Sequence, residues 1–438
     1  MDAPKHAPAA PRLRARRPRA VRRIVYLVRR SLASPGARAN LVAGIAVLVV
    51  ATLLLTSCAG SPTAARGSAP VRPSSTGRGT AAALPAAGGQ TGPQNSRPGA
   101  SAATAPAPDN PPTPAPLVEA PTDGVLESPA AAAQPVVAVM IDDAPAARPQ
   151  SGLADADILI QAPAEGGIPR YMALYQSRPA PSIGPIRSSR RYFVGWAAAW
   201  RPLYAHVGGA PNALAALQAM NGQLIWNADE FAWAEYMPRI TSRVAPHNVY
   251  SSSARLDALA AQLAVPPAPA AAWSFVDPAP LAARPTGGSL VVPYPAGVIS
   301  YAYDRSTDRY LRSVDGAPEK DAGTGARVAP YDVVVLYVAV GPLANAPGQA
   351  TNQEKGRLEV GYLGSGQALV LQDGTAIDAR WSKTSDAAPL LLTRASGTQA
   401  GTPISFVRGQ IAIQVVPLGT AVTLRLPAAP GAHAATPI

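Results

Sequence analysis

The sequence predicts an α+β fold, with a mixed, layered N-terminal α/β domain of sheets and helices followed by a β-rich C-terminal domain. Three observations support this class. Short apolar runs such as residues 136–141 (VVAVMI) have the length of buried strands, and segments with helical features accompany them. A proline-rich joint at residues 264–272 follows the last of these helices. Beyond the joint, strand-length runs separated by glycine turns dominate the chain.

The N-terminal domain is expected at residues 134–272. A strand at 136–141 begins it and ends at two adjacent aspartates. A hairpin follows, because two strand-length runs flank a Glu-Gly-Gly turn at residues 165–167. One helix should begin near serines that can cap it, and another near Pro211, a residue that suits the first helical turn. The remaining ranges are strands at 158–164, 168–176 and 203–207, and helices at 188–200, 211–220 and 254–263.

The C-terminal domain is expected at residues 273–427. Alternating side chains on both sides of residues 304–309 predict a hairpin, and the apolar run at 333–340 predicts a buried strand. Shorter strands surround Gly364, Gly366 and the Asp373-Gly374 turn. Residues 428–438 are expected to be a disordered tail. The other expected strands are 298–303, 310–314, 358–362, 368–371, 376–381, 404–406 and 411–416.

Residues 1–58 have the pattern of a signal peptide with a lipobox. The uncharged run at 41–55 is about 15 residues long, which suits the apolar region of a signal peptide and is short for a membrane-spanning helix. Leu55-Thr56-Ser57 precede Cys58, the only cysteine in the chain. We therefore expect a lipid on Cys58 that anchors the protein at the outer, extracytoplasmic face of the cell membrane. An uncleaved signal anchor is the alternative, with the same orientation because the arginines stay cytoplasmic.

The formal net charge of +12 is concentrated before Cys58. Eleven of the 38 basic residues and one of the 26 acidic residues precede it, which leaves 27 basic and 25 acidic residues and a net charge of +2. The part of the chain after Cys58 is therefore close to neutral and has no electrostatic field that would attract nucleic acid, so we exclude nucleic acid as a partner. Residues 59–133 are rich in Pro, Ala, Gly and Ser, and we expect them to form a disordered tether.

Several strings of the chain resemble one family. In the first domain they include VVAVMIDDAPAARPQSGLADADI, IGPIRSSRRYF and YAHVGGAPNAL, and the second adds DVVVLYVAV and GQIAIQVVP. Together they are similar to the YerB-like family of bacterial lipoproteins, a domain of unknown function with its own C-terminal partner domain. The resemblance covers residues 135–420 and implies a fold, an exported location and a lipid anchor, but no reaction. The sequence departs from the family's usual residues at Asp143 and Pro169.

Two carboxylates follow the first predicted strand. Asp142 and Asp143 stand at the carboxyl end of that strand, where α/β folds commonly hold ligands, and they could hold a divalent cation or supply a general base, the role considered for Asp142. Glu165, in the hairpin turn, is a second candidate catalytic carboxylate. The alternative for Asp142 and Asp143 is a turn in which a carboxylate caps backbone N–H groups.

Four arginines flank the predicted glycine turns. Arg187 and Arg190 are three residues apart at a predicted helix start, and with Arg148 and Arg170 they could bind a carboxylate or phosphate group. Internal pairing with Glu165, Asp155 or Asp157 is the alternative. His206 and His247 are candidate catalytic histidines, and two structural histidines are the alternative.

We expect no metal site and no cofactor, since a single cysteine excludes thiolate zinc sites and the chain has no HExxH or GxxxxGK motif.

Three functions are compatible with these residues, and the sequence alone leaves open whether the protein is an enzyme. The first is a binding or scaffolding lipoprotein whose cleft holds an anionic envelope ligand, such as a cell-wall fragment. The second is a module that docks an envelope protein through its β-rich part. The third is a hydrolase or transferase acting on cell-wall material. We favour the first because the arginine group and the membrane tether both suggest it.

Overall fold

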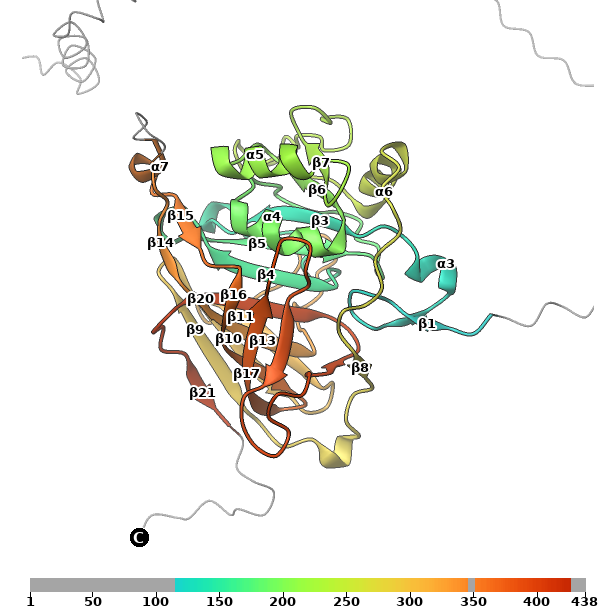
Figure 1. Cartoon of the computed structure of the whole chain (residues 1–438), viewed down its shortest axis with the longest axis vertical. Coiled ribbons are helices and arrows are strands. Elements are labelled where there is room, and N and C mark those ends of the chain that lie inside the picture. Colours follow the sequence, from blue (N-terminus) through green and yellow to red (C-terminus); the bar gives the residue numbers. More distant parts are fainter. Residues whose placement is uncertain (1–114, 346–350, 427–438) are drawn as a thin grey trace, which may run out of the picture. The chain divides into compact units, whose positions relative to one another are not determined.

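The computed structural model describes residues 115–345 and 351–426, so Cys58 and the signal peptide lie outside the described residues. Its central element is a mixed sheet of ten strands in the order β18-β17-β16-β13-β20-β4-β5-β3-β6-β7 (Figure 1). These strands are β3 Val137–Asp142, β4 Ile158–Pro163, β5 Pro169–Tyr175, β6 Leu203–His206, β7 Trp226–Asp229, β13 Asp332–Val338, β16 Gly364–Gln372, β17 Thr375–Lys383, β18 Leu391–Arg394 and β20 Ile411–Pro417.

Strands from both expected domains share this sheet. β20 lies parallel to β4 on one side and parallel to β13 on the other, so a late strand pairs with an early one. The strands β3, β4 and β5 are buried along their whole length, as expected for the middle of a sheet covered on both faces.

A second sheet of five strands has the order β12-β11-β10-β9-β21. Its strands are β9 Ser289–Tyr294, β10 Gly297–Asp304, β11 Arg309–Val314, β12 Ala317–Pro318 and β21 Thr423–Arg425. Three two-stranded pairs complete the strands of the described residues: β1 Val118–Glu119 with β2 Leu126–Glu127, β14 Val340–Pro342 with β15 Leu358–Val360, and β8 Phe275–Val276 with β19 Phe406–Val407.

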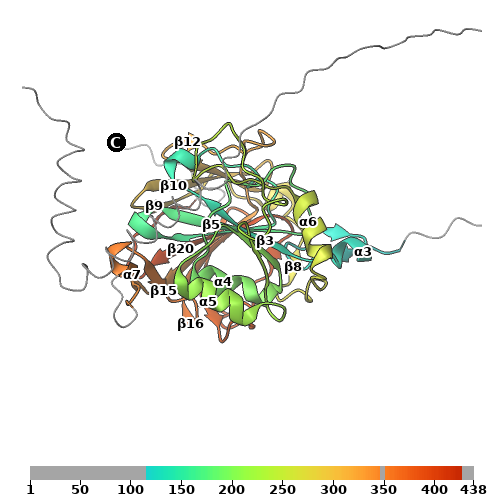
Figure 2. The same ribbon diagram turned by 90° about the horizontal axis from the view of Figure 1, so that it is seen from above.

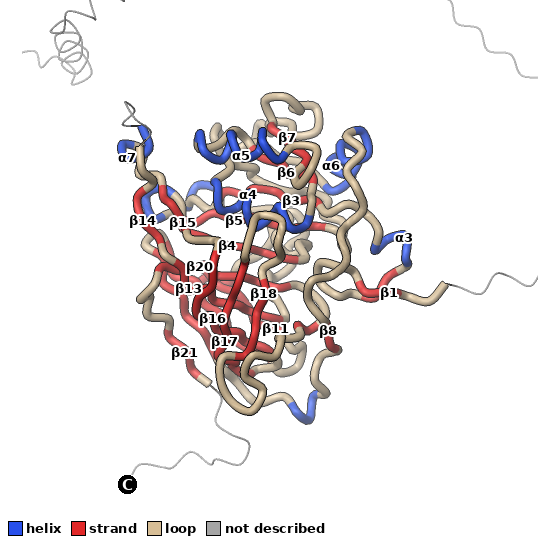
Figure 3. The backbone as a smooth tube through the Cα atoms, in the orientation of Figure 1, coloured by secondary structure: helices blue, strands red, loops and turns tan. Residues whose placement is uncertain are grey.

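Helices cover the part of the large sheet around β3 to β7, while strands dominate the later residues (Figure 3). α4 is apolar on almost every side because it is buried, and α5 begins at a proline that suits its first turn. None of the described helices has the length and hydropathy needed to cross a membrane. The helices are α3 Pro129–Ala132, α4 Arg191–Ala197, α5 Pro211–Met220, α6 Ser253–Gln262 and α7 Thr351–Glu354, with short 3-10 turns at η1 Pro145–Ala147, η2 Glu165–Gly167, η3 Ala198–Trp200 and η4 Leu281–Ala283.

The large sheet has core residues on both faces, with α4 and α5 on one side of it and β9 and β10 on the other (Figure 2). Alternate residues of β13 point to opposite faces, so Val334 and Leu336 pack in the cluster that contains α4. Their neighbours Val333 and Val335 pack against the five-stranded sheet on the other face. The α+β class predicted from the sequence is therefore confirmed.

Residues 115–133 differ from the expected tether. They form β1, β2 and α3, and both Thr122 and Asp123 are fully buried. The composition suggested disorder because large apolar side chains are few in this segment. Its polar side chains make the attachment instead, because Thr122 donates to the Asp157 carboxylate at 2.9 Å.

Candidate functional site

Asp142 ends β3 and joins two segments that are distant in the sequence. Its Oδ2 atom accepts a hydrogen bond from Nδ1 of His247 at 2.8 Å and lies 3.0 Å from Nε of Arg187. Its Oδ1 atom accepts the backbone N–H of Ala144 at 3.1 Å, so the expected turn-capping role also occurs. Arg187 is held in place because its backbone N–H donates to the Met140 carbonyl of β3 at 2.8 Å.

Glu165, in the turn between β4 and β5, forms the second ionic group of the site. Its two carboxylate oxygens accept Nε and Nη2 of Arg190, each at 2.5 Å, and one lies 3.9 Å from Nη2 of Arg170. Burial alone would raise the pKa of Glu165, but the Arg190 hydrogen bonds and the charges of both arginines outweigh it and lower the pKa. Burial and the nearby Arg190 charge lower the pKa of Arg170 to about 10.

These two groups face one open pocket of about 290 Å³. It brings together six of the eight residues proposed from the sequence as ligand-binding or catalytic side chains. The six come from strand ends and loops between positions 142 and 247, which the sheet places at one edge. The pocket is lined by Asp142, Ala144, Glu165, Ile168, Arg170, Arg187, Ser188, Arg190, His247, Lys355 and Arg357.

Arg148, the first of the four candidate arginines in the chain, does not line this pocket. Its Nε donates to the buried Asp143 carboxylate at 2.9 Å, and Asp143 also accepts Gln150 and Gln161. Arg148 instead borders a different pocket of about 360 Å³. Arg148 is therefore paired inside the protein, with Asp143 and not with one of the three carboxylates named as alternatives.

His206 also lies elsewhere, fully buried at the end of β6. Its Nδ1 is 2.8 Å from the Gly208 carbonyl oxygen, and its Nε2 is 2.7 Å from Oδ1 of Asn227. With both ring nitrogens engaged inside the protein, neither faces a substrate. His206 therefore has the environment of a structural histidine.

Lys355 and Arg357 are pocket residues that the sequence analysis missed. They lie between α7 and β15, more than 160 positions after Arg190, and no local motif marks them. The only available signal was a pair of cations within three residues next to a predicted strand. Among the described residues, no group of three or more His, Cys, Asp or Glu side chains has the arrangement of a metal site.

Comparison with known proteins identifies the family. The model of the protein of unknown function DUF3048, N-terminal domain, matches residues 123–265, and that of its C-terminal domain matches residues 290–413. The chain belongs to the DUF3048 family. It is 28% identical over 321 residues to a Bacillus subtilis protein named "Putative lipoprotein YerB", with 68% of this chain and 86% of that protein covered.

A solved structure has the same fold. The crystal structure of YerB from Bacillus subtilis matches with a TM-score of 0.61 and 25% identity, covering 70% of this chain and 99% of that one. The family resemblance noted in the sequence is thus confirmed. The DUF3048 matches carry no reaction, so the roles of the pocket residues stay predictions.

Proposed function

We propose that this DUF3048 protein is an exported lipoprotein, anchored by a lipid on Cys58 at the outer face of the cell membrane, whose pocket binds an anionic group of the cell envelope. Two observations support the anchor: the lipobox pattern ending at Cys58 and the similarity to a protein named "Putative lipoprotein YerB". A cell-wall fragment is the kind of ligand that such a location makes available. An envelope protein is the other partner to test.

The charge of the pocket carries the binding proposal. Five cationic side chains line it against two carboxylates, a surplus of three positive charges in a cavity of about 290 Å³. Glu165 neutralises much of the Arg190 charge, whereas Arg187 contacts its carboxylate only through Nε, so the two Nη groups of Arg187 remain available to a ligand. A planar guanidinium fork of this kind matches a carboxylate or phosphate group.

The first test is calorimetric titration of the protein with inorganic phosphate and with soluble cell-wall fragments. Arg187→Ala removes the available fork, and we expect it to weaken binding about tenfold or more, since a charge-assisted hydrogen bond contributes roughly 1.5–3 kcal/mol. Arg380→Ala, at an exposed position of β17, is the matched control and should bind like the parent protein. Equal affinity of the Arg187→Ala and Arg380→Ala proteins for every anion would rule out this pocket.

A hydrolase acting on cell-wall material is the second candidate, favoured by the 2.8 Å hydrogen bond between Asp142 and His247. A carboxylate that orients a histidine in this way can prepare it as a general base toward water. The same titration distinguishes the two candidates. Release of product from the wall fragments that is lost in His247→Ala favours hydrolysis, and binding without turnover excludes it.

A further inference from the structure

The pocket is lined from two regions of the chain that are far apart in the sequence. Asp142, Glu165 and Arg187 come from the region of β3 to β5, whereas Lys355 and Arg357 come from the β14–β15 arm, which comprises β14, α7 and β15. The arm lies directly against the Glu165–Gly167 turn, because a Cβ atom placed on Gly356 would lie 4.0 Å from the backbone nitrogen of Gly166.

The base of this arm is well fixed. The Tyr362 ring packs so closely on Gly195 of α4 that a Cβ atom there would lie 2.1 Å from it. The Tyr362 hydroxyl donates to Asp386 at 2.9 Å, and Arg191 of α4 donates to the same carboxylate at 2.8 Å. Lys355 and Arg357 therefore belong to an arm whose base is held against α4.

The cations Lys355, Arg357 and Arg187 differ in how many of their side-chain N–H groups already contact other residues of the protein. The Lys355 ammonium forms no hydrogen bond or ion pair with any residue among 115–345 and 351–426. Within residues 115–345 and 351–426, the Arg357 guanidinium donates only through Nη1, to the Asn352 side chain at 2.9 Å. Arg187 keeps its Nη groups, as described above. Three cations from two regions thus retain N–H donors that no described residue accepts and that face the pocket.

We infer that the pocket selects a multiply charged phosphate group, a phosphomonoester or a pyrophosphate, which Arg187 and the two cations of the arm bind together. This inference rests on the proposed anion binding. A phosphomonoester carries about −1.5 to −2 charges at neutral pH, whereas a phosphodiester or a carboxylate carries only one. A surplus of three positive charges with three sets of donors matches the more highly charged groups.

Calorimetry with pyrophosphate, glucose 1-phosphate, dimethyl phosphate and acetate tests the selection. The parent protein should bind pyrophosphate about tenfold or more tightly than dimethyl phosphate, because each added charge-assisted hydrogen bond has an effect of this size. In Lys355→Ala with Arg357→Ala the ratio should fall close to one while dimethyl phosphate still binds. Arg380→Ala with Arg425→Ala, two exposed arginines, is the control and should keep the ratio.

Each outcome has a separate meaning. Equal affinity for dimethyl phosphate and pyrophosphate, or an unchanged ratio in the arm variant, overturns the selection while anion binding stands. Binding of no anion at all contradicts the proposed function itself. Phosphatidylcholine vesicles with phosphatidic acid, compared with glucose 1-phosphate, distinguish a lipid headgroup from a soluble sugar phosphate as the source of the group.

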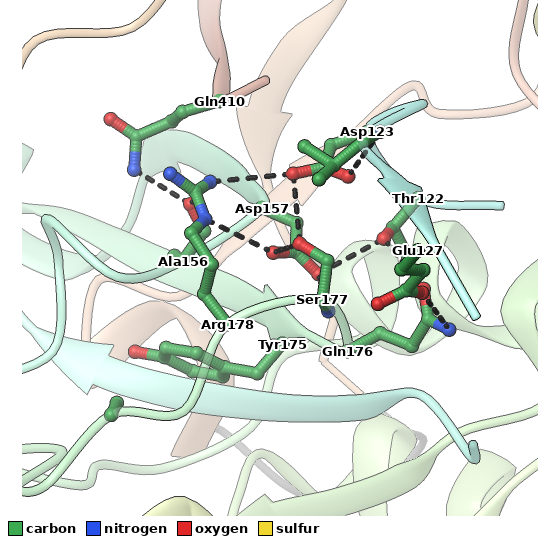
Figure 4. A network of polar contacts seen from close by, with 12 residues as sticks. Thr122, Asp123, Glu127, Ala156, Asp157, Tyr175, Gln176, Ser177, Arg178 and Gln410 are labelled. Carbon is green, nitrogen blue, oxygen red and sulfur yellow. Dashed lines mark hydrogen bonds and ion pairs between the residues drawn. The ribbon is translucent and has the colours of Figure 1, made fainter. Parts of the chain in front are cut away.

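A second inference concerns the buried polar contacts that attach residues 118–127 to the large sheet (Figure 4). Asp123, in the turn between β1 and β2, and Asp157, just before β4, are both fully buried. The Ser177 hydroxyl lies between them, 3.0 Å from Oδ2 of Asp123 and 2.7 Å from Oδ1 of Asp157. We call Thr122, Asp123, Asp157, Ser177 and Arg178 the carboxyl cluster.

The number of protons in the carboxyl cluster decides which of these contacts can be hydrogen bonds. A serine hydroxyl has one proton, so it can donate to only one of the two carboxyl oxygens. The other short contact needs a proton on a carboxyl group. Oδ2 of Asp157 already accepts the Ser177 N–H at 3.1 Å and lies 2.9 Å from the Thr122 hydroxyl, whose one proton can go to it or to Gln176 Oε1 at 3.1 Å. Asp123 faces Arg178 at 3.4 Å. Oδ1 of Asp157 is therefore the atom that fits the proton.

We infer that a proton on Asp157, donated to Ser177 while Ser177 donates to Asp123, holds residues 118–127 on the sheet, and that its loss loosens this segment. Arg178 offsets one negative charge of the pair, so a second negative charge would be buried without a cation of its own. The charged and titratable groups that surround the pair are Glu127, Asp155, Tyr175, Arg178, Asp321 and Arg408.

The direction of the pH dependence follows from Asp157. Burial, with the charge of Asp123 adding to it and Arg178 opposing it, raises the pKa of Asp157 from 3.8 to about 7. A group whose pKa is higher in the folded state stabilises it fully at low pH. That stabilisation is lost as the pH rises through the folded pKa. Attachment of the segment should therefore weaken between pH 6 and 8.

Hydrogen exchange of residues 118–127, corrected for the intrinsic exchange rate at each pH, measures this attachment. The protection factor of the parent protein should fall about tenfold from pH 6 to pH 8, as one titration near pH 7 requires. Asp157→Asn keeps a neutral donor and should remove the slope, and exposed Asp378→Asn should retain it. A flat parent profile, or an unchanged slope in Asp157→Asn, contradicts the inference. If Asp157→Asn does not fold, the parent profile alone decides, and a protection factor that does not fall between pH 6 and pH 8 contradicts the inference.

Discussion

Replacing Glu319 with alanine is expected to lower the free energy of unfolding by about 3–5 kcal/mol, the usual effect of removing one partner of a buried ion pair. Glu319 follows β12 and forms an ion pair with Arg312 of β11, whose side chain is only 1% exposed. The Tyr171 hydroxyl of β5 also donates to Glu319, at 3.3 Å. Without the carboxylate, a buried guanidinium loses its counter-charge.

Glu319 is the one carboxylate of the described residues that pairs directly with Arg312, although the Asp143 charge also raises the pKa of Arg312. Gln161 accepts Nη2 of Arg312 at 2.8 Å and the Tyr301 hydroxyl accepts Nε at 3.1 Å, but both are neutral. Chemical denaturation measures the effect, with exposed Glu359→Ala as the control that should change stability little. A loss below about 1 kcal/mol, the size typical of surface pairs, would show that water or a neutral group suffices for Arg312.

The second large effect is expected for Glu165→Gln, which should act on stability and on binding in opposite directions. The substitution removes the only carboxylate of the described residues that contacts Arg190, and Arg170 loses the same neighbour. We expect the free energy of unfolding to fall by about 2–3 kcal/mol, as for lost hydrogen bonds to charged groups. Affinity for phosphate should rise, because two more guanidinium groups become available in the pocket.

The stability effect of Glu165→Gln depends on pH. Because the pKa of Glu165 is lower in the folded protein than its usual 4.5, the carboxylate stabilises the fold above that value. The stabilisation is lost as the pH falls through the folded pKa, so the difference between the parent and Glu165→Gln should shrink in strongly acidic solution. Denaturation at pH 7 and at acidic pH, with calorimetry of phosphate binding, checks both parts. Exposed Glu235→Gln is the control, and weaker phosphate binding by Glu165→Gln would contradict the account.

Local patterns were enough to locate many elements of this fold. α5 begins and ends where the sequence predicted, because Pro211 marks its first turn and Asn221 follows its last. The strands β3, β4 and β5 were predicted from apolar runs, since buried strands need such residues along their whole length. Elements with weak apolar patterns were missed, among them β9, which contains Pro293, and the pair β1–β2.

The site was only partly accessible from the sequence, because its contacts are long-range. Asp142 and His247 are 105 positions apart, and no spacing rule predicts their hydrogen bond. Asp142 and its neighbour Asp143 looked equivalent in the sequence. In the folded protein Asp142 faces the pocket and Asp143 pairs inside with Arg148 and Gln161, since successive residues at a strand end point to opposite faces. The sequence likewise could not show that Arg187 lines the pocket whereas Arg148 pairs with Asp143.

The position of β20 has a consequence for how the chain acquires its structure. β20 is made near the end of the chain, yet it lies between β4 and β13 in the middle of the sheet. Until residues 411–417 are made, β4 and β13 each have one edge without a neighbouring strand. An unpaired strand edge can pair with another chain. A pairing between positions some 250 apart also favours slow folding. The ten-stranded sheet therefore cannot be completed until β20, its last long strand in the chain, has been made.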